Sequence, residues 1–317
     1  MKKFIIGLIC GVVITCSSAA FASGSIQAVL FPAVFQINEH TVPLSKDYKV
    51  VSLDGHAYVP VRFVAEHLGA VIGYDPELQS IQIKNGALNL TDPDYTGISV
   101  GNLVLTKSGS GTNVTGQLRL EGVGNTQNKI TATVSFYNDN SQKIGSVTIN
   151  GNAFGVDAKT FNSYGTGDFR AYSAVNLHID AVNNKPILKA LPIVYENAKY
   201  KFTLELPRSW EGKYEVTEQS NPDRGTESYS FINTSNKAEY GGYLFGITVM
   251  DIKKWNEMAQ TAMEVAPIWK VGEKGGKAFI LIPAGDVQYN PNDSQLTEDY
   301  MSMSKYINSI RTTFKVK

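Results

Sequence analysis

The sequence predicts a multidomain, β-rich protein, and three observations lead to that prediction. The chain has 317 residues, enough for two or three domains of ordinary size. Its 28 Gly and 16 Tyr, together with many Val, Ile and Thr, favour strands joined by tight turns. Apolar residues make up 43% and charged residues 18%, a balance that excludes intrinsic disorder. We expect a small α+β domain over 26–90, a β-sandwich over 95–182 and an α+β module over 193–317.

The first 22 residues have the pattern of a signal peptide. Lys2 and Lys3 precede an apolar run, Phe4–Thr15, and Ala20–Ala22 supplies small residues before a cleavage point. The apolar run is shorter than the roughly 20 residues that span a bilayer. No later run is longer, so we expect no transmembrane segment in the mature chain. The predicted location is extracellular or associated with the cell wall.

Cysteine and charge content exclude several classes of function. The two cysteines, Cys10 and Cys16, both precede the predicted cleavage after Ala22, so the mature chain would have no thiol nucleophile and no thiolate metal ligand. A lipid anchor at Cys16 is the alternative, because Val13–Cys16 loosely resembles a lipobox. Lys+Arg and Asp+Glu both number 29, and a chain without net charge indicates no nucleic-acid partner.

The segment 26–90 begins with short strands and continues into a helix. Asp54-Gly55, between two apolar runs, predicts a hairpin, and a second turn is expected at 38–40. Pro60 suits the start of a helix and Gly69 its end. A strand pair, expected at 71–74 and 80–84, follows. The apolar stripe predicted for the helix consists of Val61, Val64, Ala65 and Leu68.

The run Asp54–Ala70, with its Tyr-Val-Pro-x-Arg…Glu…Leu-Gly-Ala pattern, resembles the copper amine oxidase N-terminal-like family, also called stalk domains. The resemblance implies a small α+β domain of the kind attached to exported proteins of Gram-positive bacteria. It does not imply amine oxidation, because the family name records a domain that lies away from the copper and quinone of those enzymes. The residues that carry the resemblance are a structural signature: Tyr58, Pro60, Arg62, Glu66, Gly69 and Asp75.

The segment 95–182 alternates apolar and hydroxyl side chains in a period of two, most clearly over Ile130–Phe136. The same alternation recurs over 147–149 and 175–179, and no helix is evident, so we expect a β-sandwich. Turn-like spacers are expected at 138–140, 150–152 and 164–167. The run 114–139 is similar in pattern to the immunoglobulin-like FxLYD-type domains of bacterial envelopes.

A linker is expected over 183–186 and 191–192, before the C-terminal module. Within 193–317 the pattern predicts strands at 201–206 and 243–249 and a hairpin around Lys274-Gly275-Gly276. One helix is expected to carry Trp255, Met258, Ala259, Ala262 and Met263 on its apolar face. A last helix, capped by Asp293 or Ser294, is expected to carry Leu296, Tyr300, Met303, Ile307, Ile310 and Phe314. The module is similar to uncharacterised C-terminal modules of exported Gram-positive proteins, and the similarity implies no activity.

Candidate metal ligands are few. The four histidines are His40, His56, His67 and His178. The first two fall in expected turns, His67 is on the helix, and His178 is expected to face solvent. They lack the i, i+4 spacing of a zinc site. A site formed by His40, His56 and His67 is the alternative to ordinary surface histidines, and we expect no cofactor. Asp92/Asp94 and Asp286/Asp293 are weak calcium candidates, because no complete calcium-loop pattern occurs.

Catalytic patterns are incomplete. Ser302–Lys305 matches the Ser-x-x-Lys pattern of penicillin-binding enzymes, and Lys107–Gly109 matches their Lys-Ser-Gly, but the two occur in reversed order. Residues 111–117 imitate a phosphate-binding loop but place Gln117 where Lys is required, so a turn loop is expected. Arg62 and Glu66 lie one helical turn apart. We interpret them as a tie between helix and hairpin, through loop carbonyls and backbone amides, with a polar ligand groove as the alternative.

The sequence therefore predicts an exported, non-enzymatic protein of the cell envelope. Its partner would be a cell-wall polymer or an envelope protein. One alternative is a hydrolase of wall polymers or peptides, with its site in the C-terminal module. The other is an extracytoplasmic sensory or inhibitory domain for a membrane partner, which an exposed apolar face on the sandwich would favour.

Overall fold

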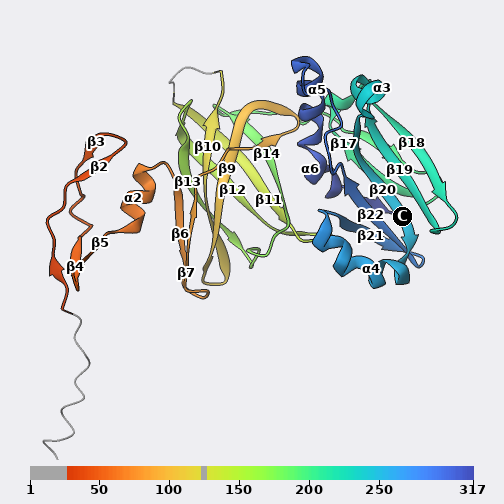
Figure 1. Cartoon of the computed structure of the whole chain (residues 1–317). Coiled ribbons are helices and arrows are strands. Elements are labelled where there is room, and N and C mark those ends of the chain that lie inside the picture. Colours follow the sequence, from red (N-terminus) through yellow and green to blue (C-terminus); the bar gives the residue numbers. More distant parts are fainter. Residues whose placement is uncertain (1–26, 123–126) are drawn as a thin grey trace, which may run out of the picture. The chain divides into compact units, whose positions relative to one another are not determined.

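The computed structural model describes residues 27–122 and 127–317, and Figure 1 shows the arrangement of their elements. The predicted signal peptide, residues 1–22, lies outside these residues. The chain divides into two compact units, residues 1–70 and 71–317. Both are rich in antiparallel strands, and the second adds helices near its C-terminal end, so the predicted β-rich, multidomain fold class is confirmed.

The first unit consists of short strands and one helix. Strands β1 (Val29–Leu30), β4 (Val51–Leu53) and β5 (His56–Tyr58) form one sheet, and β2 (Phe35–Ile37) pairs with β3 (His40–Val42). Both predicted turns are present. At the β4–β5 turn, Asp54 and Gly55 have φ of 50° and 79°, the left-handed conformation that a two-residue hairpin requires.

Helix α2 (Val61–His67) begins after Pro60 and ends before Gly69, whose φ is 74°, as predicted. The predicted stripe is wrong in part. Phe63 is buried, at 2% exposure, together with Ala65, whereas Val61 and Leu68 are exposed. The ring of Phe63 packs edge-on against Phe35, with centroids 4.8 Å apart. An aromatic ring buries more apolar area than Val or Leu, and this explains which face of so short a helix turns inward.

The second unit starts with the hairpin of β6 (Val71–Asp75) and β7 (Ser80–Lys84), as the sequence predicts. This hairpin packs beside the long strand β9 (Tyr95–Ser108) of the sandwich. A Cβ at Gly73 would lie 2.6 Å from the side chain of Val104, so the close approach requires glycine here. Gln82 Nε2 also donates to the carbonyl of Leu105.

Two antiparallel four-stranded sheets form the predicted sandwich. The first has the order β13-β10-β9-β8, with β8 (Leu90–Asp92), β10 (Gly111–Leu120) and β13 (Lys159–Thr166). The second has the order β12-β11-β14-β15, with β11 (Asn128–Tyr137), β12 (Lys143–Phe154), β14 (Ala174–Val182) and β15 (Lys185–Pro186). Between them lies one apolar core, in which Ile130, Ala132, Val134 and Phe136 are fully buried.

Several predicted turns in the sandwich are strands instead. Residues 111–117 belong to β10, 150–152 to β12 and 164–166 to β13. The glycines that suggested turns make room for neighbouring rings: a Cβ at Gly151 would lie 2.6 Å from the ring of Phe154. The predicted linker at 183–186 is also wrong, because Asn183 and Asn184 turn the chain into β15, which pairs with β14.

The C-terminal part of the second unit contains a three-stranded and a five-stranded sheet. The smaller sheet has β16 (Ile193–Glu196), β17 (Phe202–Leu206) and β23 (Lys315–Val316). The larger has the order β18-β19-β20-β22-β21, with β18 (Tyr214–Asn221), β19 (Thr226–Asn233), β20 (Tyr243–Asp251), β21 (Trp269–Lys274) and β22 (Lys277–Pro283). Short helical turns, η2 (Arg208–Trp210), η3 (Thr234–Asn236) and α3 (Lys237–Tyr240), occupy its connections.

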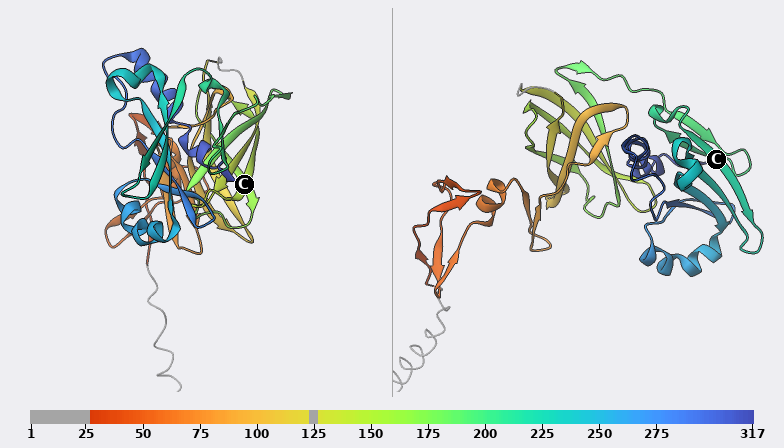
Figure 2. Two further views of the ribbon diagram at one scale, coloured as in Figure 1. Left: turned by 90° about the vertical axis from the view of Figure 1, so that its right-hand side faces the viewer. Right: turned by 45° about the horizontal axis from the view of Figure 1, so that its top comes forward.

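Longer helices contact both faces of the five-stranded sheet. Helices α5 (Ser294–Ser304) and α6 (Ile307–Arg311) pack on the face that carries Phe231, Phe245 and Leu281. They lie between this sheet and the sandwich (Figures 1 and 2). Helix α4 (Ile252–Val265) packs on the opposite face, through Trp255.

The last helix is predicted as one segment but is two. The carboxylate of Asp293 accepts hydrogen bonds from the amides of Gln295 and Leu296, the predicted cap. The helix then breaks before Tyr306, which is buried and whose hydroxyl donates to the carbonyl of Asp92 in the sandwich. The break between α5 and α6 thus coincides with a contact to the sandwich. The spacing of apolar residues along the helix could not predict that contact.

Candidate functional site

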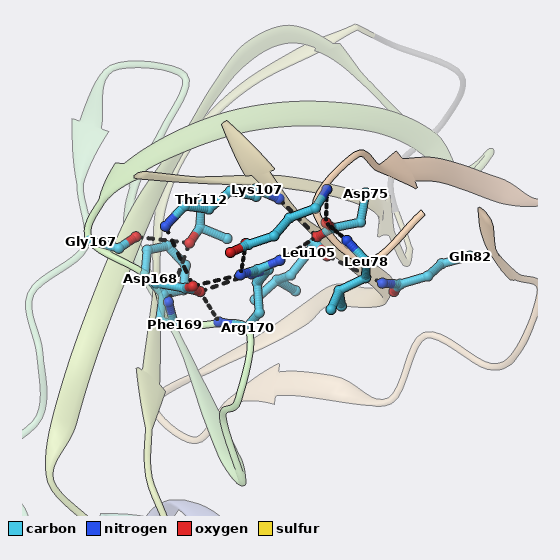
Figure 3. Close-up of polar contacts among 11 residues, drawn as sticks. Asp75, Leu78, Gln82, Leu105, Lys107, Thr112, Gly167, Asp168, Phe169 and Arg170 are labelled. Atoms are coloured by element: carbon cyan, nitrogen blue, oxygen red, sulfur yellow. Dashed lines mark hydrogen bonds and ion pairs between the residues drawn. The ribbon is translucent and has the colours of Figure 1, made fainter. Parts of the chain in front are cut away.

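A network of charges joins the β6–β7 hairpin to the sandwich (Figure 3). Its centre is Asp75, whose side chain is fully buried. One carboxylate oxygen accepts from the amides of Glu77 and Leu78, and the other accepts from the amide of Lys107 and from Arg170 Nη1 at 2.7 Å. A carboxylate with this many donors is held in its charged form.

Arg170 completes the network from the loop after β13. Its Nε and Nη2 donate to the carboxylate of Asp168 at 2.9 and 2.7 Å, and Nη2 also contacts Glu77 at 2.5 Å. Lys107 Nζ pairs with Asp168 at 3.4 Å. Such fork-on-carboxylate geometry is specific to arginine.

The pKa values in this network follow from these contacts. Burial alone would raise the pKa of Asp75, but the hydrogen bonds from Arg170 and from the amides of Leu78 and Lys107 outweigh it and hold the pKa at about 2. The hydrogen bond from Arg170 lowers the pKa of Asp168, and Asp168 in turn raises the pKa of the guanidinium. Every charge of the network has a partner, so this is a structural tie rather than a ligand site.

The structure places the other signature residues in the first unit, where they do not form a site. Tyr58 is exposed, and Pro60 and Gly69 bound the helix. Arg62 Nη1 and Glu66 Oε1 are 3.7 Å apart, and both side chains are about half exposed. They form an exposed pair one helical turn apart, which stabilises a helix by only about 0.3 kcal/mol.

The histidines do not gather into a metal site. His67 Nδ1 is 2.7 Å from the carbonyl of Phe63. His40 and His56 are exposed and are the first residues of β3 and β5, directly after the turns of the two hairpins, and these strands belong to different sheets. Over residues 27–122 and 127–317, no three His, Cys, Asp or Glu side chains are arranged to hold a metal ion. The described residues therefore do not fit a copper centre.

A cleft of about 310 Å³ lies where the sandwich meets the C-terminal module. The sandwich contributes mostly polar groups, and the C-terminal module contributes Glu205, hydroxyls and aliphatic side chains. The polar residues that line the cleft are Asp92, Asp94, Thr133, Ser135, Tyr137, Asn176, His178, Lys189, Glu205, Ser309 and Thr313. We call this the interdomain cleft.

His178 lies in the interdomain cleft between two carboxylates. Its Nδ1 is 3.1 Å from Asp92 Oδ2, and its Nε2 is 3.7 Å from Asp180 Oδ1. The prediction that His178 faces solvent is correct only in part, because the ring is 35% exposed and lies between two carboxylates. Asp92 itself is buried and also accepts from the amide of Ile179 at 2.6 Å.

Other cleft groups are also engaged. Burial, and then the charge of Asp92, raise the pKa of Asp94. Thr313 Oγ1 accepts from the amide of Glu205 and donates to the carbonyl of Ile310. The cleft offers carboxylates, a cation at Lys189 and apolar walls, an arrangement suited to holding a polar ligand.

Sequence reasoning missed the contacts that join the domains around this cleft. Arg311 is fully buried, its Nη2 donates to Ser173 Oγ at 3.0 Å, and its guanidinium lies 4.4 Å from the ring of Trp269. Burial lowers the pKa of Arg311 to about 10. Asn176 donates to Thr312 Oγ1 at 2.8 Å. A pairing between residues 136 or more positions apart leaves no local signal in a sequence.

The remaining catalytic candidates have structural roles. Ser302 Oγ donates to the carbonyl of Asp299 at 2.8 Å, within helix α5. Lys107, the other half of that pattern, belongs to the network around Asp75. Asp293 caps α5, and Asp286 accepts from the side chain of Gln288.

Comparison with known proteins bears on the N-terminal part of the chain. Residues 25–91 match the copper amine oxidase N-terminal domain. This stalk domain is not the catalytic part of those enzymes. Its match continues through β6 and β7, which belong to the second compact unit, and includes Asp75. No curated protein and no solved structure gives a significant match.

The described helices also bear on whether the chain crosses a membrane. Of those that the structure describes, none combines the length and apolar character needed to cross a bilayer.

Proposed function

We propose that this protein is an exported, non-enzymatic component of the cell envelope that binds a wall polymer or an envelope protein. The observation that carries the proposal is the match of residues 25–91 to a stalk domain that is not the catalytic part of the enzymes it is named after. The nucleophile pattern of the sequence also has structural roles: Ser302 Oγ donates to the carbonyl of Asp299, and Lys107 belongs to the network around Asp75.

Sequence features support the location part of the proposal. A signal-peptide pattern opens the chain, and the region that matches a known family is a stalk domain without catalytic residues. The Gram-positive origin and the FxLYD-like character of the sandwich belong to the same proposal.

Binding to isolated cell walls tests the function. Residues 23–317 are purified, mixed with washed walls and sedimented. Retention of the folded protein supports the proposal, and protein that stays in the supernatant at all wall concentrations contradicts it. A wall-free tube and an unrelated protein of similar size control for aggregation and for non-specific adsorption.

Secretion of the full chain tests the location. Cleavage after Ala22 is expected, so the intact mass of the exported product should correspond to a chain that begins at Ser23. A lipid-modified product that begins at Cys16 would instead make the protein membrane-anchored.

A second candidate function is hydrolysis of wall polymers or peptides. The observation that favours it is the acidic pair of the interdomain cleft, where Asp94 has a raised pKa beside buried Asp92. The pair lies on the sandwich side of the cleft, whereas the sequence predicted a hydrolase site in the C-terminal module. Two carboxylates are the groups that glycoside hydrolysis uses. Release of soluble fragments from walls by the wild type, and its loss in Asp94→Asn, would favour the hydrolase.

A further inference from the structure

The five-stranded sheet has one face that is only partly covered. Helices α5 and α6 cover the other face, whereas α4 is the one helix of the described residues that lies on this face (Figures 1 and 2). Beside α4, over β18, β19 and β20, lies a groove of about 550 Å³, larger than the interdomain cleft. We call it the sheet groove, and the lining residues that matter to its chemistry are Gln219, Arg224, Ser228, Thr248, Lys254 and Met258.

Uncharged hydrogen-bonding groups form the floor of the sheet groove. Gln219, Ser228 and Thr248 face one another across three neighbouring strands, because Gln219 pairs with Ser228 and Ser228 with Thr248. The hydroxyls of Ser228 and Thr248 are 3.0 Å apart, and either can donate. Met258 on α4 is 40% exposed and adds an apolar wall. A polyol suits such a surface, because its hydroxyls can form hydrogen bonds with the floor and its carbon atoms can pack against Met258.

The charged groups of the sheet groove have one sign. Arg224 and Lys254 line it, and among the described residues no carboxylate does. Lys254 Nζ donates to the backbone carbonyl of Arg224 at 2.6 Å, which holds both residues at the same end. Neither cation has an ion-pair partner among residues 27–122 and 127–317. The interdomain cleft differs, because carboxylates line it.

We infer that the sheet groove binds a polyhydroxylated polymer whose units are joined by phosphodiesters. The inference rests on the proposed function, since it names the class of wall component that would be bound. Arg224 presents a planar fork that suits phosphate oxygens, and Lys254 adds a second positive charge. Both cations bind one phosphate at their end of the groove, and the hydroxyls and amides of the floor bind the polyol that follows it.

Other anionic ligands fit less well. Single-stranded nucleic acids stack their bases on aromatic side chains, and the part of the chain that the structure describes brings no aromatic residue to the groove. A neutral polysaccharide would leave both cations without a counter-charge. A densely charged polymer would place anions against the uncharged floor, where the groove offers no further cation.

Titration calorimetry with poly(glycerol phosphate) oligomers tests the inference on residues 23–317. Arg224→Ala and Lys254→Ala should each weaken binding about tenfold or more, because each removes a charge-assisted contact. Lys253→Ala is the matched control: Lys253 is on the same helix, has the same charge and does not line the groove. Its affinity should equal that of the wild type, and raised salt should weaken binding by all four proteins.

Three results would overturn the inference: equal affinity in the groove variants and the control, equal affinity for uncharged dextran, or stronger binding to poly-glutamate than to the phosphate polymer. Circular dichroism shows whether the variants keep the fold, which is expected because Arg224 and Lys254 are exposed. Retention by walls without affinity for poly(glycerol phosphate) would reject this inference and leave the proposed function standing. Absence of retention by walls would reject the proposed function.

Discussion

At the scale of the residue, Asp75 shows how a sequence signature becomes a structural tie. It is the last residue of β6, and it accepts hydrogen bonds from two backbone segments and from Arg170. The stalk-domain pattern marked Asp75 as important. The pattern could not identify Arg170, because that residue is 95 positions away and outside the matched region.

Removing Arg170 should destabilise the second unit. Arg170→Ala leaves the buried carboxylate of Asp75 without its cation, and an unpaired buried charge is strongly unfavourable. The melting temperature at pH 7 should fall by several degrees, on the order of the shift caused by losing a buried pair. Arg119→Ala is the control, because Arg119 pairs with Glu121 on the exposed surface and its loss should shift the melting temperature little.

The same network predicts a dependence on pH. The folded pKa of Asp75, about 2, lies below the value of about 3.9 in an unfolded chain. A depressed pKa adds stability above the unfolded value, and that stability is lost as the pH falls from about 4 towards 2. Wild type should therefore lose more stability than Arg170→Ala over this range in thermal melts. Parallel loss in both proteins would contradict the assigned role.

At the scale of the element, the stability of the first unit should depend on the buried side chains of helix α2 and little on its exposed ones. Phe63→Ala should destabilise the first unit by about 3–5 kcal/mol, since a buried ring leaves a cavity. Leu68→Ala should change stability by about 0.5 kcal/mol, because Leu68 is 48% exposed. Urea unfolding of both variants measures the difference. A larger loss of stability in Leu68→Ala than in Phe63→Ala would instead support the apolar face that the helical period predicts.

Some elements can be predicted from local sequence patterns alone, and others cannot. The hairpin at Lys274-Gly275-Gly276 was predicted because its φ requirement is local: Gly275 and Gly276 have φ of 57° and 75°. The turns predicted at 111–117 and 150–152 failed, because glycine there accommodates a neighbouring ring or backbone rather than a turn. A glycine can be required by the backbone conformation of a turn or by the close approach of a neighbouring group. The sequence does not distinguish these two reasons, whereas the tertiary structure does.

Sites depend on tertiary structure more than elements do. The sequence offered Asp92 with Asp94 as a calcium candidate and His178 as a solvent-facing residue, and did not connect Asp92 with His178. Their 3.1 Å contact arises because β8 and β14 belong to facing sheets. The sheet groove gave no signal, since its hydroxyls are ordinary alternating residues of exposed strands.

At the scale of the whole molecule, each domain of the second unit has its own core. The core around Phe202, Trp210 and Phe245 includes no sandwich residue. The contacts across the joint, such as Arg311–Ser173 and Asn176–Thr312, are polar. Domains built in this way fold independently as a rule.

Residues 193–317 should therefore fold alone. The isolated module should unfold cooperatively on heating, because its apolar core is complete and the exposure of Arg311 to water relieves an incompletely paired buried cation. Calorimetry and near-ultraviolet circular dichroism measure this. An insoluble fragment, or a gradual melt without a transition, would mean that the sandwich completes the core.

The whole molecule also bears on whether the name of the domain matched by residues 25–91 has any meaning for copper. Cu(II) sites in proteins use imidazole ligands in the main, and thiolate or thioether in the electron-transfer class. His40 and His56 belong to different sheets, His67 is on α2 and His178 faces Asp92 and Asp180. The purified mature protein should hold no stoichiometric copper and should release no peroxide from amines. Elemental analysis of untagged protein and a peroxide assay measure the two quantities. One copper per chain that disappears in His56→Ala or His67→Ala would show instead that these side chains converge on a metal.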